Sequence, residues 1–561
     1  MTRARTYTLW RQARRVSQGL FLVLFIYFLL KTSVDAIGAP DALPTISAPV
    51  GLFLEADPLL ALYTILTTGR LYEGMLWALL ILAGTVFIGR FFCGWICPMG
   101  TINHLVGSIR AGRPKGRARL DANRYRPYQR WKYYGLAGFF GAAVFGSLQV
   151  GWLDPIAFLT RAMSLAVLPA WNTAFQGAAD LSGSGIFGFA NPIFDGTGWL
   201  LQHAVLRAKP VIFQSALIVG LLFAAVLVAN RYIARFWCRG LCPLGALLGL
   251  FSRFAIFGMQ KNHSLCTDCN RCALECQGAD DPQPGYTWRQ SECHLCLNCV
   301  ATCPEAGIEF RFFPVQEESR QDVDAGRRAV LTSVGAGFAA IPLMRAETGV
   351  TRAADPSLVR PPGSLPEKDF LARCVRCGEC MNVCPNNALH PTFLQAGFEG
   401  VWSPMLVPRV GYCEPTCVLC GTVCPTGAID EITEREKAWV HVKGAENDTR
   451  PPLRIGTAFY DTGRCLPWAM ATECIVCEEW CPTSPKAIYF EQVEVVNRAG
   501  EYVTLKRPHV DPQLCVGCGA CTYACPIKGQ PAIYVSSVGE TRNPKNSILL
   551  KTNQPQKPSA S

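Results

Sequence analysis

Residues 266–304 read CTDCNRCALECQGADDPQPGYTWRQSECHLCLNCVATCP, and this stretch decides the class of the chain. It holds two C-x2-C-x2-C-x3-C runs, and such short spacing directs four thiolates toward one point, as a metal centre requires. The pattern is that of bacterial two-cluster ferredoxins, in which the fourth cysteine of each run ligates the other cluster. The predicted ligand sets are therefore Cys266, Cys269 and Cys272 with Cys303, and Cys293, Cys296 and Cys299 with Cys276.

Four further cysteine quartets follow in the C-terminal part of the chain. The first and last are regular, the second has one extra residue, and the third has its first cysteine displaced upstream. Zinc is the competing metal, but its sites usually separate two ligand pairs by a longer loop. We predict six [4Fe–4S] clusters in all, and two pairings of the C-terminal quartets stay open: neighbour with neighbour, or outer around inner. These quartets are Cys374, Cys377, Cys380 and Cys384; Cys413, Cys417, Cys420 and Cys424; Cys465, Cys474, Cys477 and Cys481; and Cys515, Cys518, Cys521 and Cys525.

Composition narrows the class of protein further. The chain has 561 residues, of which 50% are hydrophobic and 17% charged, a balance that predicts several domains and favours a membrane protein. Its 28 cysteines sit too close together for a disulfide scaffold. The net charge of +11 is concentrated beside apolar segments, so it indicates membrane topology and no nucleic-acid partner.

Four apolar stretches precede the first quartet, near residues 16–30, 75–89, 134–152 and 210–229. Each is close to the roughly 20 residues that cross a bilayer as a helix. The N-terminus and the loop over 110–132 are rich in arginine and lysine, whereas the opposite loops carry several acids. The positive-inside rule therefore predicts that the N-terminus and the 266–303 module face the cytoplasm.

A fifth apolar segment, AGRRAVLTSVGAGFAAIPLMRAE (325–347), separates the two groups of quartets. Two adjacent arginines followed by sixteen uncharged residues resemble a twin-arginine export segment. We predict that residues 329–344 cross the membrane, which would place the last four clusters in the periplasm. The alternative is a buried helix of a soluble domain, because sixteen residues are short for a span.

The apolar half also contains an internal repeat. GRFFCGWICPMG (89–100) matches ARFWCRGLCPLG (234–245), and ADPLLALYT (56–64) is similar to LDPIAFLTR (153–161). Two copies in the same orientation would bring together the remaining four cysteines. Those thiols would bind a further metal centre or form a redox dithiol, and the alternative is simple helix packing. Asp57, Asp154 and Arg161 lie at one edge of the repeats, as functional groups or as helix caps. The four cysteines are Cys93, Cys97, Cys238 and Cys242.

These patterns predict a multidomain fold. An α-helical membrane domain, with four helices in two repeats, covers residues 1–260, and a cytoplasmic two-cluster ferredoxin module covers 261–313. A linker with the probable fifth helix covers 314–347. A periplasmic four-cluster α+β ferredoxin-like domain covers 348–535, and a polar tail over 536–561 is expected to be disordered.

The chain resembles two known families joined end to end. Residues 1–313 are similar to the NapH ferredoxin-type membrane proteins. Residues from about 320 to 535 resemble NapG and its relative MauM, through RPPGSLPEKDFLARCVRCGECMNVCP (360–385), RCLPWAMATECIVCEEWCP (464–482) and VDPQLCVGCGACTYACP (510–526).

This resemblance implies an electron-transfer unit of the bacterial inner membrane, within a hetero-oligomeric complex. Quinol would be the electron donor, and a periplasmic oxidoreductase or cytochrome subunit would be the acceptor. Two alternatives stay open. A cytoplasmic ferredoxin or flavoprotein would supply the electrons, or the clusters would serve maturation of a periplasmic metalloenzyme.

Overall fold

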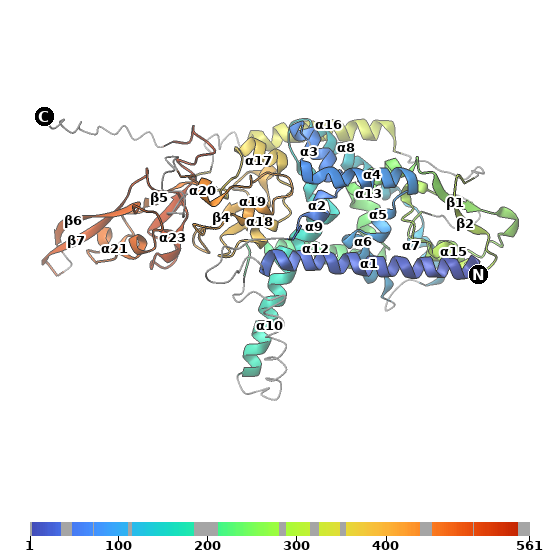
Figure 1. Ribbon diagram of the computed structural model, residues 1–561, viewed down its shortest axis with the longest axis horizontal. Coiled ribbons are helices and arrows are strands. Elements are labelled where there is room, and N and C mark those ends of the chain that lie inside the picture. The colour runs from blue at the N-terminus through green and yellow to red at the C-terminus, as the bar shows by residue number, and fades with distance from the viewer. Residues whose placement is uncertain are drawn as a thin grey trace.

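The computed structural model describes residues 3–34, 48–70, 72–109, 115–183, 211–279, 288–314, 325–347, 355–437, 452–496 and 499–547. The molecule is elongated, with a helical domain at its centre and a cysteine-rich module at each end (Figure 1). The module containing β1 and β2 lies at the end near the N-terminus. The larger module, containing β3 to β8, lies at the opposite end (Figure 1).

The helical domain is built from short helices around one long helix. Its elements are α1 (Arg3–Val34), α2 (Leu52–Glu55), α3 (Pro58–Thr68), η2 (Glu73–Leu76), α4 (Trp77–Ile88), α5 (Phe91–Trp95), α6 (Pro98–Ser108), α7 (Gly116–Asn123), η3 (Pro127–Arg130), α8 (Trp131–Ala143), η4 (Gln149–Trp152), α9 (Pro155–Ala162), η5 (Met163–Val167), α10 (Leu168–Gly183), α12 (Ala216–Tyr232), η7 (Trp237–Leu241) and α13 (Pro243–Ser252).

The predicted membrane spans are shorter than expected, with one exception. Within the described ranges, the stretch Tyr7–Thr32 of α1 is the one helix long and apolar enough to cross a membrane. Helices α4, α8 and α12 have 12, 13 and 17 residues. At 1.5 Å per residue, even 17 residues reach roughly 26 Å, less than the ~30 Å hydrocarbon core. Helix length therefore does not confirm the predicted four-helix membrane domain.

Glycines lie at the ends of two of these helices. The apolar stretch over 75–89 ends at Gly89, which has a φ of 102°. The stretch over 134–152 breaks early, after Ala143, and Gly146 then turns the chain with a φ of 69°. These left-handed conformations suit glycine, which has no Cβ. A hydropathy average does not detect the break at Gly146, because the residues on both sides of it are apolar.

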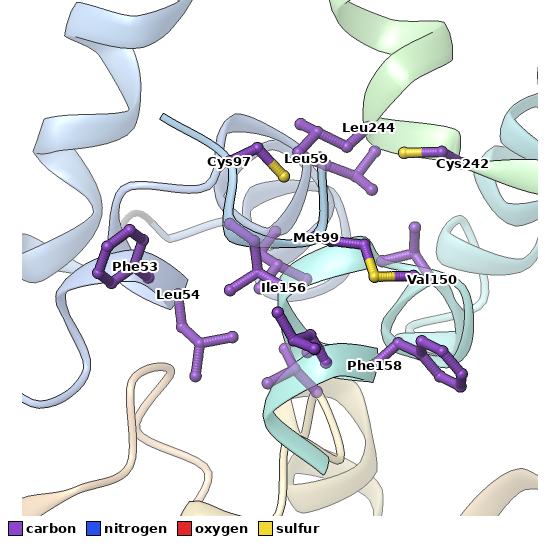
Figure 2. Packing of buried hydrophobic residues seen from close by; sticks show 14 of the residues in the cluster. Phe53, Leu54, Leu59, Cys97, Met99, Val150, Ile156, Phe158, Cys242 and Leu244 are labelled. Atoms are coloured by element: carbon purple, nitrogen blue, oxygen red, sulfur yellow. The ribbon is translucent and has the colours of Figure 1, made fainter. Parts of the chain in front are cut away.

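The two repeats meet in the core of this domain. Helices α3 and α9 begin after Asp57 and Asp154, and α6 and α13 begin after Cys97 and Cys242, each with proline in its first turn. Proline is favoured there because its fixed φ suits the helix and its missing N–H is not needed. Figure 2 shows side chains from all four helix starts packed in one apolar cluster.

The module beside the N-terminus is small. Its elements are β1 (Phe257–Lys261), η8 (His263–Leu265), α14 (Arg271–Glu275), η9 (Gln290–Glu292), α15 (Asn298–Thr302) and β2 (Ile308–Phe312). Strands β1 and β2 pair antiparallel, with Phe257 opposite Phe312. Met259, Trp288 and Phe310 form part of its own buried core.

The predicted fifth helix is present as α16 (Arg327–Glu347), which packs lengthwise against α8. Glycines allow close contact: a Cβ on Gly337 would stand 1.8 Å from the carbonyl oxygen of Gly138, and one on Gly141 would stand 2.2 Å from that of Val334. At its end, Arg345 donates two hydrogen bonds of 2.9 Å to Glu399 of the larger module. Helix α16 therefore connects the helical domain to the larger module.

The larger module combines short helices with two-stranded antiparallel sheets. The sheets are β3–β4, β5–β8 and β6–β7. Its elements are α17 (Glu367–Arg373), α18 (Glu379–Asn382), β3 (Leu389–Pro391), η11 (Phe398–Gly400), β4 (Pro404–Leu406), α19 (Leu419–Thr422), α20 (Glu434–Lys437), β5 (Thr457–Tyr460), α21 (Leu466–Ala469), α22 (Val476–Glu479), β6 (Ile488–Val496), β7 (Tyr502–Val510), α23 (Ala520–Ala524) and β8 (Ile533–Ser536).

The chain after β8 returns to the start of this module. The Ser537 N–H donates to the carbonyl oxygen of Pro356 at 2.8 Å, and Arg542 forms a 2.7 Å ion pair with Glu367. The expectation of disorder over 536–561 is therefore wrong for residues 537–547, because these contacts hold the segment in place. Residues 548–561 lie outside the described part of the chain.

Candidate iron–sulfur relay

The two-cluster module groups its cysteines as the spacing predicts. One cavity is lined by Cys266, Cys269, Cys272 and Cys303. A second is lined by Cys293, Cys296, Cys299 and Cys276. In each, the fourth cysteine comes from the other run. The two cavities differ in exposure, because Cys266 and Cys269 are exposed whereas Cys296 and Cys299 are buried.

In the larger module, neighbouring quartets exchange their fourth cysteine. Cys424 joins Cys374, Cys377 and Cys380 around one cavity, and Cys481 joins Cys515, Cys518 and Cys521 around another. The reciprocal groups follow from proximity: Cys384 lies near Cys413, Cys417 and Cys420, and Cys525 lies near Cys465, Cys474 and Cys477. The sequence left two pairings of the quartets open, and the structure has the one in which neighbouring quartets exchange their fourth cysteine.

The four cavities have the same lining of four cysteines. The same four-thiol lining indicates the same kind of occupant. In the described ranges, no three Cys, His, Asp or Glu side chains lie close enough together to hold a single metal ion. This arrangement is compatible with an iron–sulfur cube, in which each thiolate binds a different iron atom.

The surroundings of the thiols also suit clusters. Backbone N–H groups donate to sulfur in several quartets, as from Ala279 to Cys276 at 3.3 Å and from Ala458 to Cys515 at 3.4 Å. Burial raises the pKa of Cys465 to about 12, despite a backbone N–H bond from Trp468. The Cys465 thiol is therefore protonated until iron binds it, and its ligation releases a proton.

The centres of the larger module follow one another. The N–H of Cys413, in the second quartet, donates to the carbonyl oxygen of Cys518, in the fourth, at 2.8 Å. The first pair of centres is therefore in contact with the second pair, through the backbone of two ligand cysteines. The Cys413 group also contacts a buried cation, because Lys437 is 0% exposed and its Nζ lies 3.6 Å from the Cys413 sulfur.

The first centre of this module lies against the helical domain. Val375 and Cys377 belong to the same apolar core as the helices. Arg161 Nη1 donates to the carbonyl oxygen of Arg376 at 3.0 Å. A Cβ on Gly151 would stand 2.3 Å from the carbonyl oxygen of Val375, so the two backbones are in direct contact.

The two-cluster module lies against the other end of the repeats. A Cβ on Gly94 would stand 2.0 Å from the carbonyl oxygen of His294, and Trp95 Nε1 donates to that of Leu295 at 3.1 Å. Gly94 adjoins Cys93 and His294 adjoins Cys293, so this contact joins the C-x-x-x-C-P loop to a ligand loop. Nearby, the buried Glu292 pairs with Arg90 and Lys132.

The four thiols of the repeats come together between these junctions. Cys93, Cys97, Cys238 and Cys242 are 7%, 5%, 6% and 4% exposed, and they lie within electrostatic range of one another. Cys97 and Cys242 approach from opposite sides with their sulfur atoms directed inward (Figure 2). The structure therefore brings the four predicted thiols together.

Asp57 and Asp154 occupy equivalent cap positions. Asp57 Oδ1 accepts from Leu59 N at 2.7 Å, and Asp154 Oδ2 accepts from Ala157 N at 2.7 Å. The capping alternative is therefore the one found. Both are fully buried and lie beside each other.

Sequence reasoning missed three buried cations near these centres: Arg90, Arg235 and Lys437. A signal existed for the arginines, because both precede the first cysteine of the repeat by three residues. Lys437 carries no such signal, since its approach to Cys413 depends on the tertiary fold.

Comparison with known proteins supports this chemistry. Three family models described as 4Fe-4S binding domains match the chain, one at residues 70–116, 215–259 and 418–443, one at 370–390 and one at 507–531. The ferredoxin-type protein NapG of Escherichia coli is 33% identical over 37% of this chain and 85% of its own length. The methylamine utilization ferredoxin-type protein MauM of Paracoccus denitrificans is 31% identical over 41% of this chain and 92% of its own length. The putative electron transport protein YccM of Escherichia coli is 26% identical over 53% of this chain and 75% of its own length. No solved structure gives a significant match.

The cysteine groups and these relatives define an iron–sulfur electron-transfer protein of the ferredoxin type. Within that class, the chain belongs to the NapG/MauM family of ferredoxin-type proteins. The similarity of residues 1–313 to NapH stays a prediction.

Proposed function

We propose that this protein is a membrane-bound relay that passes electrons from the quinol pool to a periplasmic oxidoreductase. The six cysteine quartets would hold six [4Fe–4S] clusters in the groups described above. One observation carries the proposal: the module with β1 and β2 and the larger module lie at opposite ends of the helical domain (Figure 1). Cavities lined by four cysteines lie in both modules. One-electron centres in such an order suit transfer across the domain.

The surface of the helical domain supports membrane insertion. Large apolar side chains are exposed on the long helix and on three others: Val16 is 71% exposed, Leu80 63%, Leu217 74% and Leu331 71%. Extensive apolar surface marks a membrane or protein interface. The close glycine contacts between α8 and α16 are also typical of helices that pack within membranes. Neighbouring helices would shield the ends of the short helices in this domain from lipid.

Charge supports one orientation. Helix α16 begins at the exposed Arg327 and Arg328 and ends where Arg345 contacts the larger module. With the basic N-terminus and the loop over 110–132 in the cytoplasm, the larger module would face the periplasm. A reporter fused after residue 547 tests this, because the preceding segment is packed and stays intact. Activity of a cytoplasm-specific reporter there would overturn the orientation.

A second donor is favoured by the exposure of Cys266 and Cys269. A cluster at the surface of the cytoplasmic module can exchange electrons with a soluble ferredoxin or flavoprotein. In this case electrons would travel the full length of the molecule, from the module with β1 and β2 to the periplasmic side.

Anaerobic reduction of the full chain in liposomes separates the two donors. We expect a quinol analogue to bleach the cluster absorbance, and EPR spectra to show reduced clusters in the larger module. In the variant Cys377→Ser, the outer centres of that module should stay oxidised, whereas the control Cys474→Ser should affect its own centre alone. Clusters that respond to dithionite and reduced ferredoxin but ignore quinol would exclude the quinol route.

A further inference from the structure

Two buried arginines occupy the same position in the two repeats. Arg90 is 0% exposed and Arg235 is 1% exposed. Arg90 Nη1 donates to the carbonyl oxygen of Ser291 at 2.6 Å, and Arg235 Nη1 donates to that of Cys93 at 3.0 Å. In both, Nε and Nη2 have no hydrogen-bond partner among the described residues. Leaving charged donors buried and unpaired is costly, so these groups indicate an anionic ligand.

Each arginine reaches the Cys-Pro turn of the other repeat. A Cβ on Gly245 would stand 2.7 Å from Arg90 Nη2 and 3.4 Å from the Cys242 sulfur. A Cβ on Gly100 would stand 3.7 Å from Arg235 Nη1 and 3.6 Å from the Cys97 Cβ. The two repeats therefore share one site, in which each supplies two thiols and one guanidinium.

Two helix starts add to the positive field at this site. Cys97 and Cys242 are the N-caps of α6 and α13, which have 11 and 10 residues. Gly245 N donates to the Cys242 sulfur at 3.1 Å. A helix start carries a partial charge of about +0.5, which favours thiolate over thiol.

Charge separates the possible roles of the four thiols. A neutral dithiol or a disulfide would leave Arg235 without an acidic partner among the described residues, and Arg90 with one that it shares. Glu292 lies 3.4 Å from Arg90, but Lys132 and Tyr133 also bind this carboxylate. A tetrathiolate iron–sulfur cluster with a 2+ core carries a net charge of about −2, since the four thiolates contribute −4. Two arginines would balance that charge.

We propose that Cys93, Cys97, Cys238 and Cys242 hold one iron–sulfur cluster between the two repeats, with Arg90 and Arg235 balancing its charge. The inference rests on the proposed relay and places a seventh centre at its middle. The family model described as a 4Fe-4S binding domain covers both motifs, each of which supplies two cysteines.

The centre bridges the two modules. It would take one electron from the cluster at Cys293, reducing one ferric iron to ferrous, and would return to the oxidised state by passing that electron to the centre at Cys377. No bond breaks and no proton is required in this step. The backbone contact of Gly94 with His294 places the cluster at Cys293 beside Cys93. Val375, next to the centre at Cys377, packs into the same helical core from the side of the larger module.

The test uses the full chain, purified anaerobically in detergent. Cys93→Ser and Cys242→Ser remove one thiol from each repeat, and Met99→Leu is the matched control because Met99 is equally buried in the same core. We expect each serine variant to lose about two or four iron atoms per chain, with the matching sulfide and one Mössbauer component. The six other clusters and the control should be unchanged.

The arginines supply a readout that loss of packing would not give. Arg90→Gln and Arg235→Gln should each retain the extra centre and shift its midpoint potential to more negative values. Potentials of the distant clusters should not move.

Three results would overturn the inference. They are unchanged iron content in both serine variants, alkylation of the four thiols in the native protein, and their recovery as disulfides. If the serine variants fail to assemble, the Mössbauer spectrum of the unaltered protein decides, because six cubes without a seventh component would refute the site. That outcome leaves the proposed relay intact, whereas absence of the six cubes would refute the relay itself.

Discussion

Lys437 offers the sharpest test of how this protein sets the potential of a single centre. Its ammonium group is fully buried, and it donates to the carbonyl oxygens of Glu414 and Cys417 as well as to the Cys413 sulfur. Substitution Lys437→Met removes a positive charge beside the centre that contains Cys413 and Cys420. Because reduction adds a negative charge, the loss should lower the midpoint potential of this centre.

The expected size of the shift follows from Coulomb's law. At the 3.6 Å between Nζ and the Cys413 sulfur, one unit charge interacts by about 4.6 kcal/mol at an effective dielectric of ~20. The added electron spreads over the cube, so a mean separation of roughly 6 Å is more realistic and gives about 2.8 kcal/mol. With ~59 mV for each tenfold change in equilibrium constant, this is a fall of about 120 mV.

An EPR-monitored redox titration of the four-cluster module within the full chain measures this shift. Lys437→Arg keeps the charge and should stay near the wild-type potential. Lys486→Met is the matched control, because that lysine is 42% exposed and pairs with Glu478. The reasoning fails if the Lys437→Met potential stays within about 20 mV of wild type, rises, or falls no further than that of the control.

Two further substitutions test packing and charge. Gly94→Ala places a Cβ 2.0 Å from the carbonyl oxygen of His294, whereas the control Gly19→Ala meets nothing within 4 Å. Gly94→Ala should lower the free energy of unfolding of the two-cluster module by about 1–3 kcal/mol, which would appear as faster proteolysis of that module. Equal proteolysis rates in the two variants would refute the contact. For Glu367, burial would raise the pKa, but Arg360 and Arg542 hold it at about 2. The unfolded pKa is about 4.3, so this carboxylate stabilises the fold fully above that value and loses its effect as pH falls toward 2. Glu367→Gln should therefore lower the thermal midpoint by a constant amount from pH 7 to about 5, and the gap should narrow below about 4.3. A gap that widens in acid would contradict this sign.

Cysteine spacing made part of the site predictable from sequence alone. The grouping of Cys303 with Cys266 was predictable because the two runs have the spacing of two-cluster ferredoxins, in which the fourth cysteine of each run ligates the other cluster. The choice between neighbouring and outer quartets in the larger module was not predictable, because it depends on long-range contacts. Hydrogen bonds from Leu365 N to Ala428 O and from Asp430 N to Gly363 O hold the first pair of quartets together.

The helical domain was less predictable for a different reason. An apolar stretch reports burial or contact with lipid, but it does not report where a helix stops, and Gly146 ends the α8 region inside such a stretch. Arg90 and Arg235 were predictable in principle from the repeat. Their buried, unpaired donors became visible only with the neighbouring backbone in place.

The pairing of Ser537 with Pro356 has a consequence for biosynthesis. The opening and closing segments of the larger module are fastened to each other, so a nascent chain can complete this unit only when its last segment has left the ribosome. Cys525 belongs to the centre that begins at Cys465 and is also made late. Assembly of the centre at Cys465 and closure of its domain thus both wait until residues 525–542 have been made, and a chain truncated before residue 537 would lack the fastening altogether.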